Sequence, residues 1–429
     1  MQRRGGFLPE TFALACGPAI FVTPPLPLGR KTAYGGAVKR CLSPKGQKTP
    51  LYEGFASSVK AIIASLAPVG CLLAAKYGNA TLPNFLDQRA ALAAHYDLAP
   101  SMAAAEATRA IYARMERVVP LADWAMFAPY VIAINRLKAE RNAVILGHNY
   151  MTPEIYHGVA DFVGDSLQLA IKATEVEADV IVQCGVHFMA ETSKIMNPSK
   201  IVLMPDMAAG CSLAESITAD GVAEMRAKYP GAPVVSYVNT TAEVKAASDV
   251  CCTSANALQV VNAMPGDTVI MTPDQYLARN VAALTHKRVV WWEGSCIVHE
   301  LYTAADLRAY REGDPDVKII AHPECTPEVV AEADFTGSTK GIIDWVHQHK
   351  PAKAMLVTEC SMAANIADEL PEVEFAKPCN MCPYMKMITL EKILYALHTM
   401  TGEVLVDPAV SARARVAVQR MIDISRAAA

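Results

Sequence analysis

The stretch VILGHNY, residues 144–150, decides the fold because the chain repeats its form twice more. It is an apolar run of strand length that ends in a polar pair, and the same form recurs in VVSYVN (234–239) and VKIIAHPE (317–324). The leading polar residues, His148, Tyr237 and His322, are spaced by 89 and 85 residues. Short runs rich in Val and Ile that alternate with amphipathic segments are typical of parallel β/α structure.

Further series of residues keep the same order and nearly the same period. The second runs are DFVGDS (161–166), DVCCTS (249–254) and DFTGST (334–339), the third are DVIVQCG, DTVIMTP and AMLVTE, and the fourth are KIVLMPD, RVVWWEG and EVEFAKP. A cysteine follows each fourth run: Cys211, Cys296 and Cys382, spaced by 85 and 86 residues. Residues 130–390 are therefore predicted to contain three copies of a unit of about 86 residues.

The predicted fold class is α/β, with three similar α/β/α units. We expect an N-terminal extension, largely disordered or weakly structured, at 1–100, and a first unit with a helical lead-in at 101–215. The second and third units are predicted at 216–300 and 301–390, followed by C-terminal helices that pack on the core at 391–429. If the units close around a pseudo-threefold axis, their equivalent loops meet at the centre.

Composition excludes several classes of protein. The 429 residues carry a net charge of −4, which argues against general nucleic-acid binding, and no apolar run has the roughly 20 residues of a membrane-spanning helix. The 12 cysteines are dispersed, and the adjacent Cys251 and Cys252 cannot easily both pair, so we predict reduced thiols and a cytoplasmic location. Pro18 interrupts the apolar stretch 11–22. This favours a disordered extension, or a start codon assigned too far upstream, over an export signal.

Three hydroxyl residues end the second runs. Ser166, Ser254 and Thr339 each precede a helical pattern, so each is predicted to act as the N-cap of that helix. Simple capping would explain any one of them. Three helix N-termini brought together would instead create a site for anions.

The periodic cysteines suggest a metal centre. Cys379 and Cys382 have the C-x-x-C spacing of half a zinc site or of a redox dithiol, but no second zinc knuckle is present, and the pair lies too late in the chain for a thioredoxin-like motif. One thiolate from each of three units would suit an iron–sulfur cluster with an open iron, because cubane clusters usually take four cysteines. Such a site would suit dehydration chemistry.

The same residues resemble the quinolinate synthase family across about residues 130–395. The matching stretches are HNYMTPEIYHGVADFVGDSLQLA, VHFMAETSKI, MPDMAAGCSLAE, YVNTTAEVKAASD, TSANA, PDQYLARNV, WEGSCIVHE, HPECTPEV, GSTKGII and CNMCPYMKM. The resemblance implies small parallel sheets around a pseudo-threefold axis with the active site at the centre. It also implies a 4Fe-4S cluster held by Cys211, Cys296 and Cys382. In the loop that contains Cys382, some family members carry C-x-x-C-x-x-C, whereas this chain has Ala376 in place of the first cysteine. A thiol switch would therefore have to use Cys379 with Cys382.

The implied reaction condenses iminoaspartate with dihydroxyacetone phosphate to give quinolinate, phosphate and water in NAD biosynthesis. The family's substrate contacts fall on His148, Ser166, Tyr237, Asn239, Ser254, His322, Glu324 and Thr339. A transient contact with an L-aspartate oxidase or dehydrogenase is a further expectation, with no nucleic-acid or membrane partner.

Acid–base roles are predicted for residues that can titrate or donate a proton: His148, His322, Glu324 and Tyr150. Lys194 and His299 are weaker candidates for the cavity, and an exposed helix face suits Lys194 equally well. Two other functions predict different sequence patterns. A non-enzymatic cluster sensor would not need the polar series, and a phosphosugar aldolase or isomerase on an eight-stranded barrel would show eight β/α units of about 25 to 30 residues without periodic cysteines.

Overall fold

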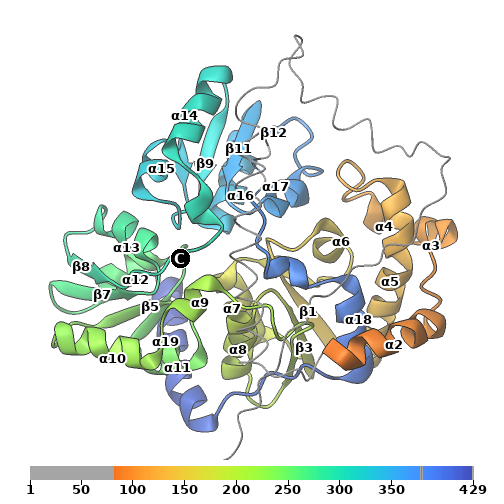
Figure 1. Ribbon diagram of the computed structural model, residues 1–429, viewed down its shortest axis with the longest axis horizontal. Helices are drawn as coiled ribbons and strands as arrows, with labels where there is room; N and C mark the ends of the chain where they lie inside the picture. Colours follow the sequence, from red (N-terminus) through yellow and green to blue (C-terminus); the bar gives the residue numbers. More distant parts are fainter. Residues whose placement is uncertain (1–81, 377, 379, 428–429) are drawn as a thin grey trace, which may run out of the picture. The chain divides into compact units, whose positions relative to one another are not determined.

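Each copy of the repeat folds into a four-stranded sheet in the computed structural model (Figure 1), which describes residues 82–376, 378 and 380–427. The first sheet contains β1 (Ala143–His148), β2 (Phe162–Gly164), β3 (Val180–Cys184) and β4 (Ile201–Leu203). The second contains β5 (Val234–Tyr237), β6 (Val250–Cys252), β7 (Thr268–Thr272) and β8 (Arg288–Trp291). The third contains β9 (Lys318–Ala321), β10 (Phe335–Thr336), β11 (Lys353–Val357) and β12 (Glu374–Ala376). Every strand falls on a predicted run.

The three sheets have one topology. Their strand orders are β2-β1-β3-β4, β6-β5-β7-β8 and β10-β9-β11-β12, and all the pairs are parallel. In the first sheet, for example, His148 at the end of β1 lies beside Gly164 at the end of β2. Because parallel strands end at the same edge, the loops that carry the polar residues lie side by side within each unit. The predicted class of three similar α/β/α units with small parallel sheets is confirmed.

The aspartate that opens each second run has a structural role in all three units. The carboxylates of Asp161, Asp249 and Asp334 accept hydrogen bonds from the backbone N–H groups of Ile145, Val234 and Ile319, over 2.8, 2.7 and 2.8 Å. Each carboxylate also pairs with a basic side chain: Lys138, Arg226 and Arg311 respectively. These bonds tie the first strand of each unit to the segment that leads into the second.

Helices flank the sheets and join the units. The first part of the chain contains α2 (Leu82–His95), α3 (Met102–Ala107), α4 (Arg109–Tyr112), α5 (Leu121–Glu140), α6 (Pro153–Tyr156), α7 (Ser166–Glu175), α8 (His187–Met196) and α9 (Ser212–Ser216). The second contains α10 (Ala219–Lys228), α11 (Ala242–Ala246), α12 (Ala257–Ala263), α13 (Gln275–Ala282) and the 3-10 helix η3 (His299–Leu301). The third contains α14 (Ala304–Gly313), α15 (Pro327–Ala331), α16 (Thr339–His349), α17 (Ser361–Ile366) and the 3-10 helix η4 (Met385–Met387).

Two C-terminal helices pack on the earlier units. Helix α18 (Leu390–Thr399) contacts α5, and α19 (Pro408–Arg426) contacts α8, α11 and α12 (Figure 1). Much of the predicted N-terminal extension lies outside the described residues; its described part includes α2, which contacts α18. Among the described residues, no helix has both the length and the apolar character needed to cross a bilayer.

The predicted helix caps are wrong. The N-caps of α7 and α16 are Asp165 and Ser338, one residue before Ser166 and Thr339, and each cap side chain accepts a backbone N–H of the first turn. The N-cap of α12 is Asn256 rather than Ser254. A neighbouring Asp, Ser or Asn is as good a cap as the predicted residue, so local chemistry alone does not choose between them. Other residues occupy the three N-cap positions, with a side-chain cap at α7 and α16 only, so the three hydroxyls are left to other partners.

Candidate functional site

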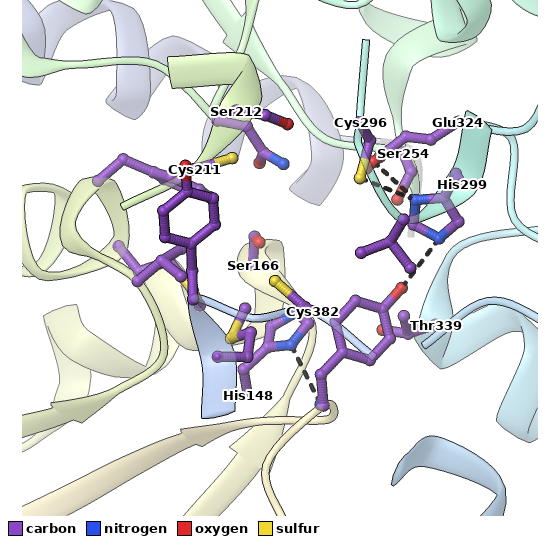
Figure 2. Close-up of a pocket in the computed structure, with 18 of the residues that line it drawn as sticks. His148, Ser166, Cys211, Ser212, Ser254, Cys296, His299, Glu324, Thr339 and Cys382 are labelled. Atoms are coloured by element: carbon purple, nitrogen blue, oxygen red, sulfur yellow. Dashed lines mark hydrogen bonds and ion pairs between the residues drawn. The ribbon is translucent and has the colours of Figure 1, made fainter. Parts of the chain in front are cut away.

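One pocket is lined by loops from all three units (Figure 2). Its lining includes the twelve residues that were predicted as catalytic, substrate-binding or metal-ligating: His148, Tyr150, Ser166, Cys211, Tyr237, Asn239, Ser254, Cys296, His322, Glu324, Thr339 and Cys382. The first unit contributes the ends of β1 and β2, and the other units contribute the equivalent ends. The structure thus brings these residues together, while their chemical roles remain predictions.

Each of the three periodic cysteines lies one to three residues before a short helix. Cys211 is the N-cap of α9, and Cys296 and Cys382 each lie three residues before the first residue of a 3-10 helix, η3 or η4. Each sulfur is approached by backbone N–H groups two and three residues further along the chain: Leu213 and Ala214, Val298 and His299, and Tyr384 and Met385. Figure 2 shows the three side chains around the same space, from different sides. Backbone dipoles of this kind favour a thiolate over a thiol.

Burial opposes these dipoles. It raises the pKa of Cys211 to about 12 and that of Cys382 to about 11, and it raises the pKa of Cys296 well above the usual range, where the nearby Glu324 adds to the effect. Without a cation the three groups are therefore neutral thiols near pH 7. A bound metal would displace the protons, because thiolates are the form that ligates. Three convergent sulfurs, each beside two amide N–H groups, fit a thiophilic metal centre such as an iron–sulfur cluster.

A buried polar network lies beside Cys296. The Nδ1 atom of His299 is 3.2 Å from the Cys296 sulfur and 3.1 Å from Oε2 of Glu324, and the potential ligand atoms of these three residues all lie within 4.8 Å of one another. The hydroxyl of Tyr237 donates to the other carboxylate oxygen of Glu324. This Cys/His/Glu group could hold a metal ion.

Glu324 is ionised in this network. Burial alone would raise its pKa, but His299 and His322, together with the hydrogen bonds from His299 and Tyr237, hold the pKa well below the usual range. Burial, with the negative charge of Glu324, conversely raises the pKa of Tyr237 well above its usual range. The pair therefore presents a carboxylate that accepts and a phenol that donates.

His148 and His322 are held in the same way by their own loops. In each, Nδ1 accepts the backbone N–H two residues further on, of Tyr150 over 3.2 Å and of Glu324 over 3.3 Å. Burial lowers the pKa of His148 to about 4 and that of His322 to about 3, although Glu324 opposes both shifts. Both rings are thus neutral near pH 7, and because Nδ1 accepts, Nε2 carries the hydrogen. The Nε2 atom of His322 lies 3.1 Å from the Ser254 hydroxyl.

The remaining predicted residues offer hydrogen bonds from several directions. The Thr339 hydroxyl accepts the side-chain amide of Asn149 over 2.9 Å, so the first unit touches the start of α16 in the third. The Oδ1 atom of Asn239 is buried and has no hydrogen-bond partner among the described residues. An unpartnered buried oxygen is costly, so a ligand donor at this place would stabilise the site.

Sequence reasoning missed some residues of the site. Thr358 bonds Tyr150 through its hydroxyl over 2.5 Å and His299 Nε2 over 3.0 Å, and it follows β11, so the ends of the third runs should also have been considered. His299, only a weak candidate in the sequence, lines the pocket, whereas Lys194 turns away and binds the Lys200 carbonyl and Glu403. Cys379 lies outside the described residues, so the thiol-switch prediction is untested.

Comparison with known proteins gives one family. A family model described as quinolinate synthetase A protein matches residues 132–423. A quinolinate synthase of Sinorhizobium medicae is 58% identical over 330 residues, covering 77% of this chain and 92% of the relative. One of Sinorhizobium fredii is 55% identical over 363 residues, covering 85% and 98%, and one of Agrobacterium fabrum is 59% identical over 314 residues, covering 73% and 91%.

Proposed function

This chain belongs to the quinolinate synthase family and is an enzyme of NAD biosynthesis, and we propose that it condenses iminoaspartate with dihydroxyacetone phosphate to give quinolinate, phosphate and water. One observation carries the proposal. Cys211, Cys296 and Cys382, one from each unit, line the pocket that also contains the polar ends of the first and second strands. The proposed metal ligands and the polar groups thus line the same pocket.

We propose that the three cysteines hold a 4Fe-4S cluster. Three ligands suit a cubane in which one iron has no protein ligand, and when bound this iron would supply Lewis-acid chemistry, polarising an oxygen that leaves as water. The paired amide N–H groups near each sulfur support this assignment, because hydrogen bonding to sulfur is one of the protein's means of tuning such clusters. Thiols that must stay reduced fit a cytoplasmic enzyme.

The anionic groups of the substrates require hydrogen-bond donors, and the pocket lining offers neutral hydroxyl and amide groups. Ser166 and Thr339 are the first residues of α7 and α16, helices of 10 and 11 residues, so their hydroxyls lie beside free backbone N–H groups and the positive end of a helix dipole. Ser254 and Asn239 face the same pocket from the second unit. We assign phosphate and carboxylate binding to these groups.

Proton movement is assigned to the buried network. The ionised Glu324 can accept a proton from a substrate carbon or nitrogen, and the neutral rings of His148 and His322 can donate hydrogen bonds through Nε2. Burial and the charge of Glu324 raise the pKa of Tyr150 well above its usual range, so Tyr150 acts as a hydrogen-bond donor rather than as a base. Because these groups come from different units, a substrate in the pocket would be held from several sides.

The test is anaerobic purification, counting of iron and sulfide, and a quinolinate assay with iminoaspartate supplied by an L-aspartate oxidase or dehydrogenase. Cys211→Ser, Cys296→Ser and Cys382→Ser should each lose the cluster and at least about 100-fold of the activity, since each removes one of three ligands. The control is Cys184→Ala, because this thiol is fully buried on β3 and absent from the pocket lining. Stoichiometric zinc without sulfide in the wild-type protein would overturn the cluster assignment.

A further inference from the structure

One hydroxyl joins two of the three cysteine loops. Ser212, the residue after Cys211, donates from Oγ to the backbone carbonyl of Ser295 over 3.1 Å and accepts the backbone N–H of Ile297 over 3.2 Å. These two groups flank Cys296 on either side. A single side chain from the first unit therefore holds the backbone around the cysteine of the second unit.

The same two loops pack closely elsewhere. Ser216, at the other end of α9, accepts the indole N–H of Trp292 at its backbone carbonyl over 2.9 Å. A Cβ atom placed on Gly294 would clash with the Ser216 hydroxyl and would lie 2.6 Å from the Pro273 carbonyl, closer than real Cβ contacts. The loop before Cys296 is thus pressed against α9 without space for a side chain, and Ser212 binds it at the end nearest the cysteine.

The third cysteine loop is attached differently. The ammonium group of Lys386 contacts the Tyr150 carbonyl over 2.8 Å, the Ser361 hydroxyl over 2.6 Å and the Glu359 carboxylate over 2.8 Å. The contact between this loop and α9, from the Tyr384 hydroxyl to Glu215, is longer, at 3.3 Å. Among the described residues, Ser212 is the side chain from another unit that bonds the backbone on both sides of a periodic cysteine.

We propose that Ser212 is a positioning residue that sets the separation and relative orientation of Cys211 and Cys296. Since Ser212 adjoins Cys211 in the chain and bonds both peptide groups beside Cys296, a movement of either cysteine relative to the other must break at least one of these bonds. The inference rests on the proposed function, in which the two sulfurs ligate one cluster. Ser212 itself touches neither the metal nor the substrate in this role.

The experiment compares Ser212→Ala with Ser212→Thr, which keeps the hydroxyl, and with Ser295→Ala. The last is a matched control, because it removes a nearby hydroxyl that binds Glu300 but leaves the backbone carbonyl that Ser212 uses. Three properties are measured anaerobically on the purified protein: the rate of iron loss to a chelator, the reduction potential of the cluster, and its electron paramagnetic resonance spectrum after reduction. Ser212→Ala should lose iron about tenfold faster than the wild type, with a shifted reduction potential and spectrum. In the two other variants the rate of iron loss should stay within about twofold of the wild type, with the potential and the spectrum unchanged.

Hydrogen exchange at the Ile297 amide gives a second measurement that does not require Ser212→Ala to fold. In the wild type and in Ser212→Thr this amide should be protected, both with and without the cluster. Fast exchange of the Ile297 amide in the wild type would overturn the proposal. The proposal would also be overturned if the rate of iron loss, the reduction potential and the spectrum of Ser212→Ala equalled those of Ser295→Ala. A wild-type protein without iron and sulfide would refute the proposed function instead, and protection of Ile297 would still report the contact itself.

Discussion

Glu324→Gln offers the sharpest test of the proposed acid–base chemistry. Glu324 is 4% exposed, and its two carboxylate oxygens accept hydrogen bonds from Tyr237 and from His299. A glutamine has one acceptor oxygen, so its NH₂ group must face one of these two donors. At least one charge-assisted bond is lost, about 1.5 to 3 kcal/mol, and the proton acceptor is lost with it.

We expect kcat to fall by about 10²- to 10⁴-fold, the range that general acid–base catalysis contributes. The iron and sulfide content should not change, because Glu324 is not among the three proposed ligands. Quinolinate formation is followed anaerobically, and KM is measured for each substrate. Glu328→Gln is the matched control, since Glu328 is exposed and lies in the first turn of α15.

The reasoning would be refuted by a Glu324→Gln enzyme that keeps a full cluster and a kcat within about twofold of the wild type. A second result bears on the same point. Because neighbouring groups hold the pKa of Glu324 well below its usual range, the carboxylate stays ionised at pH 5. In the wild-type enzyme, protonation of Glu324 should therefore cause no decrease in kcat/KM as the pH falls from 8 to 5.

Two further predictions concern stability. The pKa of His148 is about 4 in the folded chain and about 6.5 in the unfolded chain. Between these two pH values the unfolded state binds more protons than the folded state, so the free energy of unfolding decreases as the pH falls from 6.5 to 4. From pH 7 to pH 5 this group should remove about 2 kcal/mol from the free energy of unfolding, and urea titrations of His148→Gln should show a correspondingly smaller pH dependence. Lys386→Met should lower the free energy of unfolding by about 3 kcal/mol, because it leaves the fully buried Glu359 carboxylate without its cation. If the double variant Lys386→Met, Glu359→Gln is no more stable than Lys386→Met alone, loss of this ion pair is not the cause of the destabilisation.

The sheets could be predicted from the sequence because three copies of one pattern supported one another. The run DFTGST has only two residues in strand conformation, Phe335 and Thr336, and it could be assigned only by its place in the repeat. The gathering of the cysteines follows from the same period. The caps could not be predicted, since Asp165 and Ser166 are both suitable N-caps and only the backbone angles distinguish them.

The parts of the site that were missed are not marked by a residue type that recurs in the other units, although Thr358 lies within the third run AMLVTE. Thr358 and Lys386 reach the pocket region from the end of β11 and from the loop after Cys382, and the other two units have no counterpart that would mark them in the sequence. The role of His299 depends on its distances from Cys296 and Glu324, which come from different units. Contacts between units are set by packing, and a pattern within one unit does not contain them.

Because the cysteines are divided among three units, the proposed metal centre would form only when all three units are folded. A chain in which one unit has opened retains two of the three sulfurs, so the cluster would bind the complete native state far more tightly than any partly folded state. The free energy of cluster binding would then stabilise the native fold of all three units together, as any ligand does that binds only the native state. A destabilising substitution far from the pocket, in any unit, should therefore become visible first as lost iron, before the secondary structure changes.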